Sequence, residues 1–160
     1  MPITCNKEVY ELKYLFFSDL HGLRKANILL KFAEEQEPDA CFDLGDHGSL
    51  FEGDKFGGEI VKVLAVKLSN YHAIYGNHDD LDIIQAMPQW LTDGLNVVGD
   101  LRIFSVNGIW GTRVVDKPWH HTVASMIKLM PDAGEVDLLL THEHAFGLDY
   151  HTAQDKFKFH

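Results

Sequence analysis

The chain is organised around Gly76-Asn77-His78-Asp79, which follows the apolar run at residues 71–75. That run is expected to be a buried strand bounded by turn residues. Glycine allows a sharp turn where the strand ends, and an amide, an imidazole and a carboxylate come directly after it. The Asn77 oxygen is a hard ligand for a divalent cation, and His78 can act as a general acid that Asp79 orients. A polar loop after a strand explains these four residues equally well, so two further loops decide the interpretation.

Two earlier apolar runs end in comparable polar residues. Residues 12–17 are expected to form a strand that leads to the pattern Asp19-x-His21. On an extended backbone these two side chains point the same way and can bind one ion together, although such a pair on its own is more often a solvated loop. Residues 39–44 are expected to form a short buried strand followed by a Gly-Asp dipeptide that ends at Asp46, on the same rim as Asp19.

The segments between these strands have the spacing of helices. Apolar residues recur at helical intervals in residues 23–36, where Pro38 stops the pattern, and again in residues 60–68. Three alternations of strand and helix predict an α/β fold with a parallel sheet and right-handed crossovers. In open sheets of this kind ligands bind at the carboxyl ends of the strands, which is where all three polar motifs fall.

The second half of the chain has a different pattern, with short strands expected at residues 95–98, 101–106, 109–110 and 136–140. Asn107-Gly108 is typical of a type I′ hairpin turn between two of them. A helix is expected over residues 118–130, starting at a proline. The last strand delivers the sequence Thr-His142-Glu-His144.

Length, charge and cysteine content narrow the class of protein. The chain has 160 residues and is expected to form one domain, residues 1–160, large enough for a substantial core. Its net charge of -10 argues against nucleic-acid binding by phosphate neutralisation, but not against a small phosphate-bearing substrate, because bound cations would reverse the local field. Cys5 and Cys41 lack zinc-site spacing. The N-terminus lacks a signal-peptide pattern and no apolar run could span a membrane, so a cytoplasmic protein is expected.

The polar strand ends together offer a set of oxygen and nitrogen ligands, namely Asp19, His21, Asp46, Asn77 and His142. A two-metal site needs a carboxylate that bridges both ions, with mixed ligands on either side. This set suits two divalent ions, with Mn²⁺ as the first candidate and Fe, Ni, Zn or Mg as alternatives, and it contains no thiolate for a softer ion. His78 falls beside these ligands, where it can protonate a leaving group with Asp79 orienting it.

In this order the motifs resemble the signature of the calcineurin-like metallophosphoesterases, and especially the small phosphodiesterase-type members. The matching residues are Asp19-Leu20-His21, Gly45-Asp46, Gly76-Asn77-His78-Asp79 and Thr141-His142. The match extends over nearly the whole chain, and four ordered motifs are far more specific than any one of them. The resemblance implies a β-sandwich flanked by helices (α/β/β/α), a dinuclear metal site and hydrolysis of phosphoesters.

The resemblance also implies a role for each matching residue. Asp19 and His21 would bind the first ion, and Asp46 would bridge the two. Asn77 and His142 would bind the second ion. The histidine of the Gly-Asn-His-Asp motif would be the catalytic residue.

One family motif, the final Gly-His-x-His, is not found after His142. Either the Thr-His-Glu-His sequence is a degenerate version of it, or the family's last strands are absent, which is the interpretation that we prefer. Each ion would then have three protein ligands instead of four, so that metal binding is expected to be weak. His144 shares an extended face with His142 and is assigned to the metal site as the nearest spare imidazole, while His151, His160 or a neighbouring subunit are other sources.

Two functions are compatible with these motifs. The first is a metal-dependent phosphodiesterase acting on small phosphate esters, and the second is a non-catalytic or weakly active protein-binding module on the same scaffold. A lost catalytic histidine would favour the module, but His78 is present. His47 and Arg113 are weaker candidates for substrate contacts, and Trp119 is expected to pack on the core. A homo-oligomer is left open.

Overall fold

The computed structural model describes residues 11–48, 54–111, 117–122, 125, 128 and 136–143. The first half alternates strands and helices: β1 (Tyr14–Phe17), α1 (Leu23–Gln36), β2 (Ala40–Asp43), α2 (Asp54–Lys67) and β3 (Tyr71–Ala73). The elements with described bounds in the second half are α3 (Leu81–Ile84), β4 (Gly94–Val98), β5 (Leu101–Val106), β6 (Ile109–Gly111), β7 (His120–Thr122) and β8 (Leu138–Thr141). The α/β fold expected from the sequence is confirmed.

The first sheet is parallel, as predicted, and its strand order is β1-β2-β3. Helix α1 returns the chain from β1 to β2 and ends at Gln36. Glu37, directly after it, adopts a left-handed conformation (φ 48°) and donates its N–H to the Ala33 carbonyl at 2.9 Å. Pro38 follows directly and cannot continue the helix. Because all three strands run the same way, their carboxyl ends meet at one edge of the sheet.

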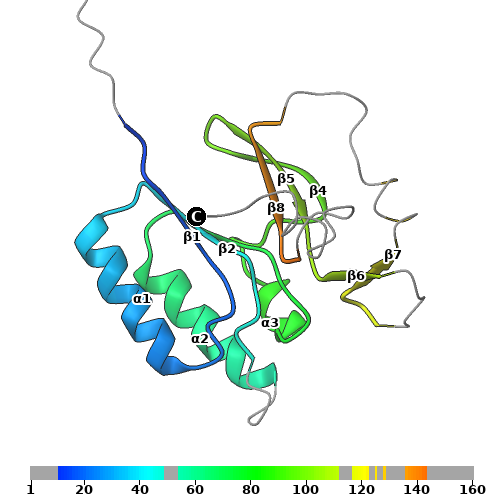
Figure 1. Ribbon diagram of the computed structural model, residues 1–160, viewed down its shortest axis with the longest axis horizontal. Coiled ribbons are helices and arrows are strands. Elements are labelled where there is room, and N and C mark those ends of the chain that lie inside the picture. Colours follow the sequence, from blue (N-terminus) through cyan, green and yellow to red (C-terminus); the bar gives the residue numbers. More distant parts are fainter. Residues whose placement is uncertain are drawn as a thin grey trace, which may run out of the picture.

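The core lies in two layers on either side of this sheet. Alternate residues of β2 face opposite layers: Cys41 packs among the buried residues of the helices, such as Leu64, whereas Phe42 packs against Ile103 and Leu140 of the second sheet. Figure 1 shows α1 and α2 together on one side of the molecule, with β4, β5 and β8 on the other. The second sheet therefore covers the face of the first sheet that the helices leave free.

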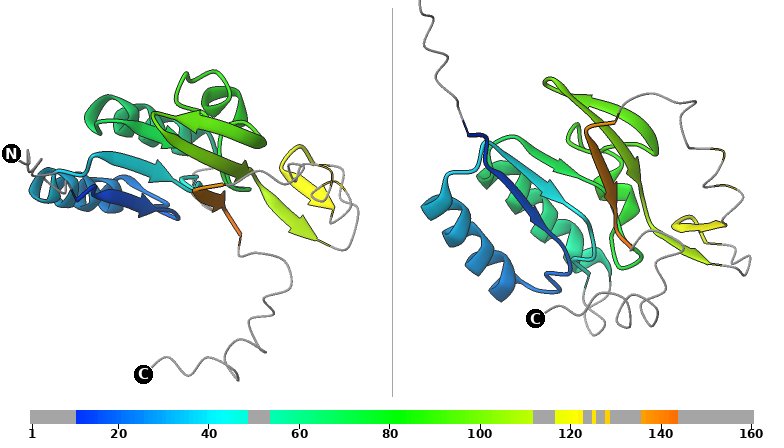
Figure 2. Two further views of the ribbon diagram at one scale, coloured as in Figure 1. Left: turned by 90° about the horizontal axis from the view of Figure 1, so that it is seen from above. Right: turned by 45° about the horizontal axis from the view of Figure 1, so that its top comes forward.

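The second sheet has the order β4-β5-β8, with β4 antiparallel to β5 and β5 parallel to β8. The hairpin expected at Asn107-Gly108 is not formed, because β6 pairs in parallel with β7 and continues beyond β5 (Figure 2). A type I′ turn requires a positive φ at both central residues, and among the described residues only Gly108 of this pair has one, at 71°. Asn107 is instead fully buried.

The helix expected over residues 118–130 is also wrong in its first part. Residues 120–122 form the strand β7, paired with β6, although Ser125 and Lys128 are helical. The remaining residues of that segment after 122 lie outside the described parts of the chain. Pairing with a neighbouring strand here overrode a weak helical pattern.

Candidate metal centre

The loops after β1 and β2 are joined where the two strands end. The Asp19 N–H donates to the Gly45 carbonyl at 2.9 Å. Three non-glycine residues of these loops have left-handed backbones, with φ of 55° at Asp19, 44° at His21 and 66° at Asp46. This conformation is uncommon outside glycine and tends to persist at functional sites, where the surrounding structure imposes it. All three are residues that the sequence assigned to metal binding.

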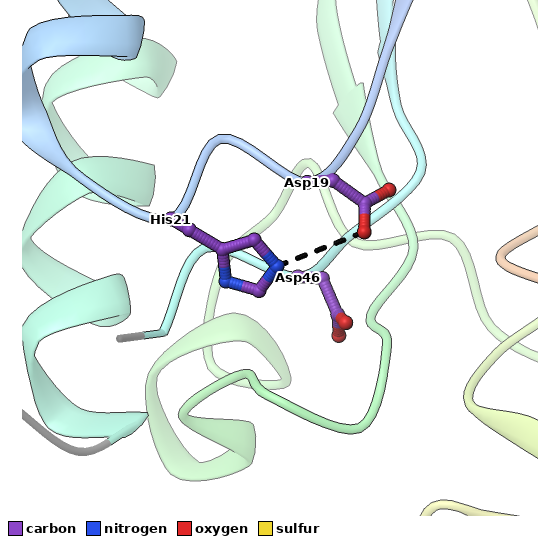
Figure 3. A group of neighbouring side chains, drawn as sticks. All are labelled: Asp19, His21 and Asp46. Carbon is purple, nitrogen blue, oxygen red and sulfur yellow. Dashed lines mark ion pairs between the residues drawn. The ribbon is translucent and has the colours of Figure 1, made fainter. Parts of the chain in front are cut away.

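Asp19, His21 and Asp46 form one cluster of potential ligands (Figure 3). One ligand atom from each lies within 4.8 Å of the others, and His21 Nε2 is 3.7 Å from Asp19 Oδ1. The other ring nitrogen of His21, Nδ1, lies 2.5 Å from the Gly48 carbonyl, which can only accept, so Nδ1 carries a proton and Nε2 is left facing the carboxylates. The Asp19 side chain is 56% exposed, so the cluster is open to solvent on this side.

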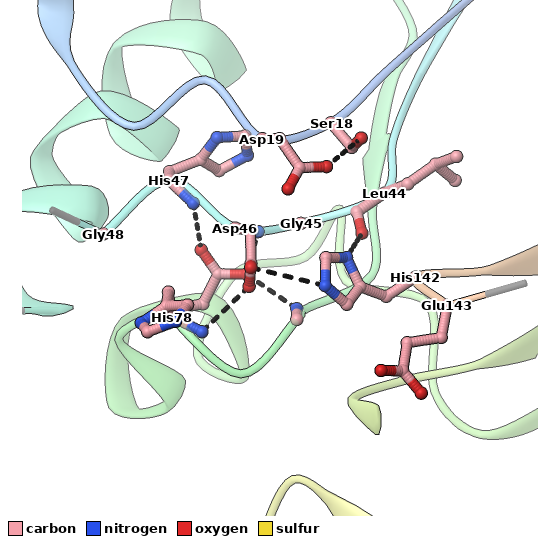
Figure 4. Close-up of polar contacts among 12 residues, drawn as sticks. Ser18, Asp19, Leu44, Gly45, Asp46, His47, Gly48, His78, His142 and Glu143 are labelled. Atoms are coloured by element: carbon pink, nitrogen blue, oxygen red, sulfur yellow. Dashed lines mark hydrogen bonds and ion pairs between the residues drawn. The ribbon is translucent and has the colours of Figure 1, made fainter. Parts of the chain in front are cut away.

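His142 reaches the same Asp46 carboxylate from the end of β8 (Figure 4). His142 Nε2 lies 3.4 Å from Asp46 Oδ2, and both side chains are largely buried. Its Nδ1 is held at 2.8 Å by the Leu44 carbonyl, the same arrangement as in His21. Burial disfavours the imidazolium, but the hydrogen bond and charge of Asp46 outweigh burial and raise the pKa of His142 to about 9. Asp46 therefore lies between two groups of potential ligands.

The loop after β3 brings the backbone of His78 to this carboxylate. The His78 N–H donates to Asp46 Oδ1 at 2.8 Å, and the His78 ring lies edge-to-face with the ring of His21, with centroids 5.9 Å apart. A Cβ added to Gly76 would lie 2.1 Å from Asp46 Oδ1 and 2.8 Å from His142 Cε1, so only glycine fits there. Asn77 follows directly and is half-buried.

The donor set fits a divalent cation. It consists of carboxylate oxygens and imidazole nitrogens that already face one another, and Asn77 directly follows Gly76, which packs against Asp46 and His142. Such ligands suit borderline and hard divalent ions. The buried Asp46 is ionised, because hydrogen bonds from His142 and the His78 backbone lower its pKa in spite of the opposing effect of burial.

The comparison with known families agrees with this site. The sequence model of the calcineurin-like phosphoesterase family matches residues 12–158. The chain belongs to the calcineurin-like phosphoesterase family. No curated protein and no solved structure gave a match. The chemistry of this family is metal-dependent hydrolysis of phosphoesters. No helix in the described parts of this phosphoesterase is long and apolar enough to cross a membrane.

Asp79 joins the loops after β2 and β3 of the phosphoesterase. Its carboxylate accepts hydrogen bonds from the backbone N–H groups of Gly76 (2.7 Å), Asp46 (2.7 Å) and His47 (2.8 Å). Burial raises the pKa of Asp79, although the charge of His47 and these three donors oppose the rise. This clamp was not predicted from the sequence, and the role of Asp79 in orienting His78 stays a prediction.

Replacing Asp79 by Ala is expected to lower the free energy of unfolding by about 3 kcal/mol, because a buried donor without a partner costs ~1–3 kcal/mol and three donors lose theirs. Urea denaturation monitored by circular dichroism measures the change. Asp82, which is exposed in the first turn of α3, serves as the control, and Asp82→Ala should change stability by no more than about 0.5 kcal/mol. Equal stabilities for the two variants would show that the clamp contributes nothing.

His47, the weaker candidate for substrate contact, is fully buried, so its side chain is not open to a substrate in this structure. Its Nε2 lies 2.7 Å from both oxygens of Asp43, and Asp43 also accepts from the Tyr71 hydroxyl at 2.5 Å. Burial lowers the pKa of His47, but the charge and hydrogen bond of Asp43 outweigh burial and raise it to about 9. The signal that could have revealed this pair was a carboxylate at the end of a buried apolar run, which requires a partner.

The other predicted residues divide into two groups. Trp119 packs against the core as expected. His144, His151, His160 and Arg113 lie outside the described residues, so the assignment of His144 to the metal site remains a prediction.

Proposed function

We propose that this phosphoesterase is a phosphodiesterase for small phosphate esters, with a dinuclear metal site. The observation that supports the proposal is that Asp46 is shared between two ligand groups, with Asp19 and His21 on one side and His142 on the other. A carboxylate shared in this way is what two neighbouring cations require.

Asp19, His21 and Asp46 would hold one ion, and Asp46, Asn77 and His142 would hold the other. We take Mn²⁺ as the first candidate, with Fe, Ni, Zn and Mg as alternatives. When bound, such ions supply Lewis-acid polarisation of the phosphoryl group and lower the pKa of water. The exposed side of Asp19 leaves room for a substrate to approach the cluster.

His78 supplies the proton chemistry in this proposal. Its ring lies against His21, at the rim of the ligand cluster, while its backbone N–H is bonded to Asp46. A ring nitrogen of His78 donates a proton to the leaving-group oxygen as the bond to phosphorus breaks. The hydrogen bonds that Asp79 accepts from the backbone of Asp46 and Gly76 hold the loops after β2 and β3 in place during this proton transfer.

The proposal is tested by removing metal with a chelator and restoring Mn²⁺, Mg²⁺, Zn²⁺, Fe²⁺ or Ni²⁺ separately. Hydrolysis of bis(4-nitrophenyl) phosphate and of 4-nitrophenyl phosphate is then compared, with bound metal measured by elemental analysis. We expect activity that depends on added metal, is highest with Mn²⁺ and favours the diester. A chain that binds two ions yet hydrolyses neither ester would support the protein-binding module, and preference for the monoester would overturn the phosphodiesterase assignment.

A further inference from the structure

Asn107, part of the dipeptide that the sequence assigned to a hairpin turn, is a fully buried amide that uses its whole hydrogen-bonding capacity. Its Oδ1 accepts from the Tyr75 N–H at 2.9 Å and from Trp90 Nε1 at 3.1 Å. Its Nδ2 donates to the Leu91 carbonyl and to Asp93 Oδ1, both at 2.9 Å. An amide side chain has two donors and two acceptor lone pairs, so the orientation of Asn107 is fixed by four partners.

The next residue, Gly108, also bonds to the backbone of Tyr75. The Gly108 N–H donates to the Tyr75 carbonyl at 2.6 Å, so consecutive residues hold both backbone polar groups of Tyr75. Gly108 has a φ of 71°, and a Cβ there would lie 2.0 Å from the Trp119 carbonyl oxygen. The close approach requires glycine, and Tyr75 lies three residues before His78.

The loop is fixed at its far end by groups of the site itself. The Gly76 N–H donates to Asp79, and the His78 N–H donates to Asp46. The His78 carbonyl accepts from the Gly48 N–H at 2.6 Å. Asn107 and Gly108 therefore provide the anchor at the entry of the loop, and the hydrogen bonds of this anchor do not involve the ligand atoms assigned to metal.

We propose that Asn107 is a positioning residue, which fixes Tyr75 and thereby sets where the His78 ring meets the leaving group. The proposal rests on the proposed function, because it assumes that His78 donates a proton. A displacement of about 1 Å at a reacting group can cost ~10²-fold in rate. The anchor thus acts on proton transfer by His78, and because Asn77 lies in the same loop, the effect is measured at saturating metal.

Asn107→Ala is the direct test, with kcat measured on bis(4-nitrophenyl) phosphate and on diphenyl phosphate. Phenolate is a poorer leaving group than 4-nitrophenolate, so its departure depends more strongly on a proton donor. We expect kcat at saturating Mn²⁺ to fall up to about 10²-fold on diphenyl phosphate and several-fold less on the nitrophenyl ester. In the His78→Ala background the same substitution should have no further effect on kcat, because the group that it positions is gone.

Equal losses on both esters, or losses that multiply with those of His78→Ala, would show that Asn107 is merely structural. A wild-type protein that is inactive with every metal would overturn the proposed function and this inference with it. Activity in the wild type together with equal losses would overturn this inference alone.

A milder pair of variants keeps the test open if Asn107→Ala does not fold. Asp93 accepts hydrogen bonds from both the backbone and the side chain of Asn107, and it is partly exposed. Asp93→Ala frees the amide and should lower kcat on diphenyl phosphate more than on the nitrophenyl ester. Asp93→Asn retains an acceptor and should restore most of the rate. Equal fold-losses of kcat on both esters in Asp93→Ala, or no recovery in Asp93→Asn, would contradict the proposal.

Discussion

Asp46→Asn is expected to abolish hydrolysis while leaving the fold intact. Asp46 lies against both proposed ligand groups, and a neutral amide cannot offset the repulsion between two divalent ions a few ångströms apart. Lewis-acid stabilisation of a phosphoryl group is worth several kcal/mol, and each ~1.4 kcal/mol is a factor of ten in rate, so the loss should be at least about 10³-fold. The amide has the same shape and can still accept from the His78 N–H.

The measurement is kcat on bis(4-nitrophenyl) phosphate at saturating Mn²⁺, with bound metal per chain determined in parallel. Asp100→Asn is the control, because Asp100 is exposed in the turn between β4 and β5. Urea denaturation of Asp46→Asn should show a cooperative unfolding transition, as expected for a folded protein. Activity retained at saturating metal would mean that Asp46 does not bridge two ions.

His78→Ala is expected to slow turnover by ~10²–10⁴-fold, the usual contribution of a general acid. The contact between His78 and Asp46 is made by the backbone N–H, so it survives the substitution. The His78 ring packs against the ring of His21 but was not assigned to metal. Metal content should therefore stay close to that of the wild type.

Substrates with different leaving groups give the sharper measurement. The loss in His78→Ala should be largest for diphenyl phosphate and smaller for the nitrophenyl ester, whose leaving group departs more readily without a proton. If metal content collapses instead, His78 is a metal ligand and its assignment as the general acid is wrong. A uniform loss on all esters would indicate that His78 stabilises charge on the phosphoryl oxygens and does not donate a proton.

The sequence was sufficient to predict features that depend on neighbouring residues. The apolar runs of β1, β2 and β3, and the helical spacing between them, predicted a parallel sheet whose strand ends carry polar residues. Strand pairing then placed Asp19 and His21 beside Asp46. The Asp-x-His pair was expected on an extended chain, but Asp19 and His21 both have left-handed backbones, so the conformation of the loop after β1 brings them together.

Only the tertiary structure decided the contacts that join distant parts of the chain. Asp79 bonds to the backbone 33 residues away at Asp46, and His142 bonds to Leu44 over a separation of 98 residues. The hairpin signal at Asn107-Gly108 was misleading, because the side chain of Asn107 has four partners elsewhere. Local patterns report backbone preference, whereas a buried polar group adopts whatever conformation satisfies its hydrogen bonds, and those partners are set by how the two sheets pack.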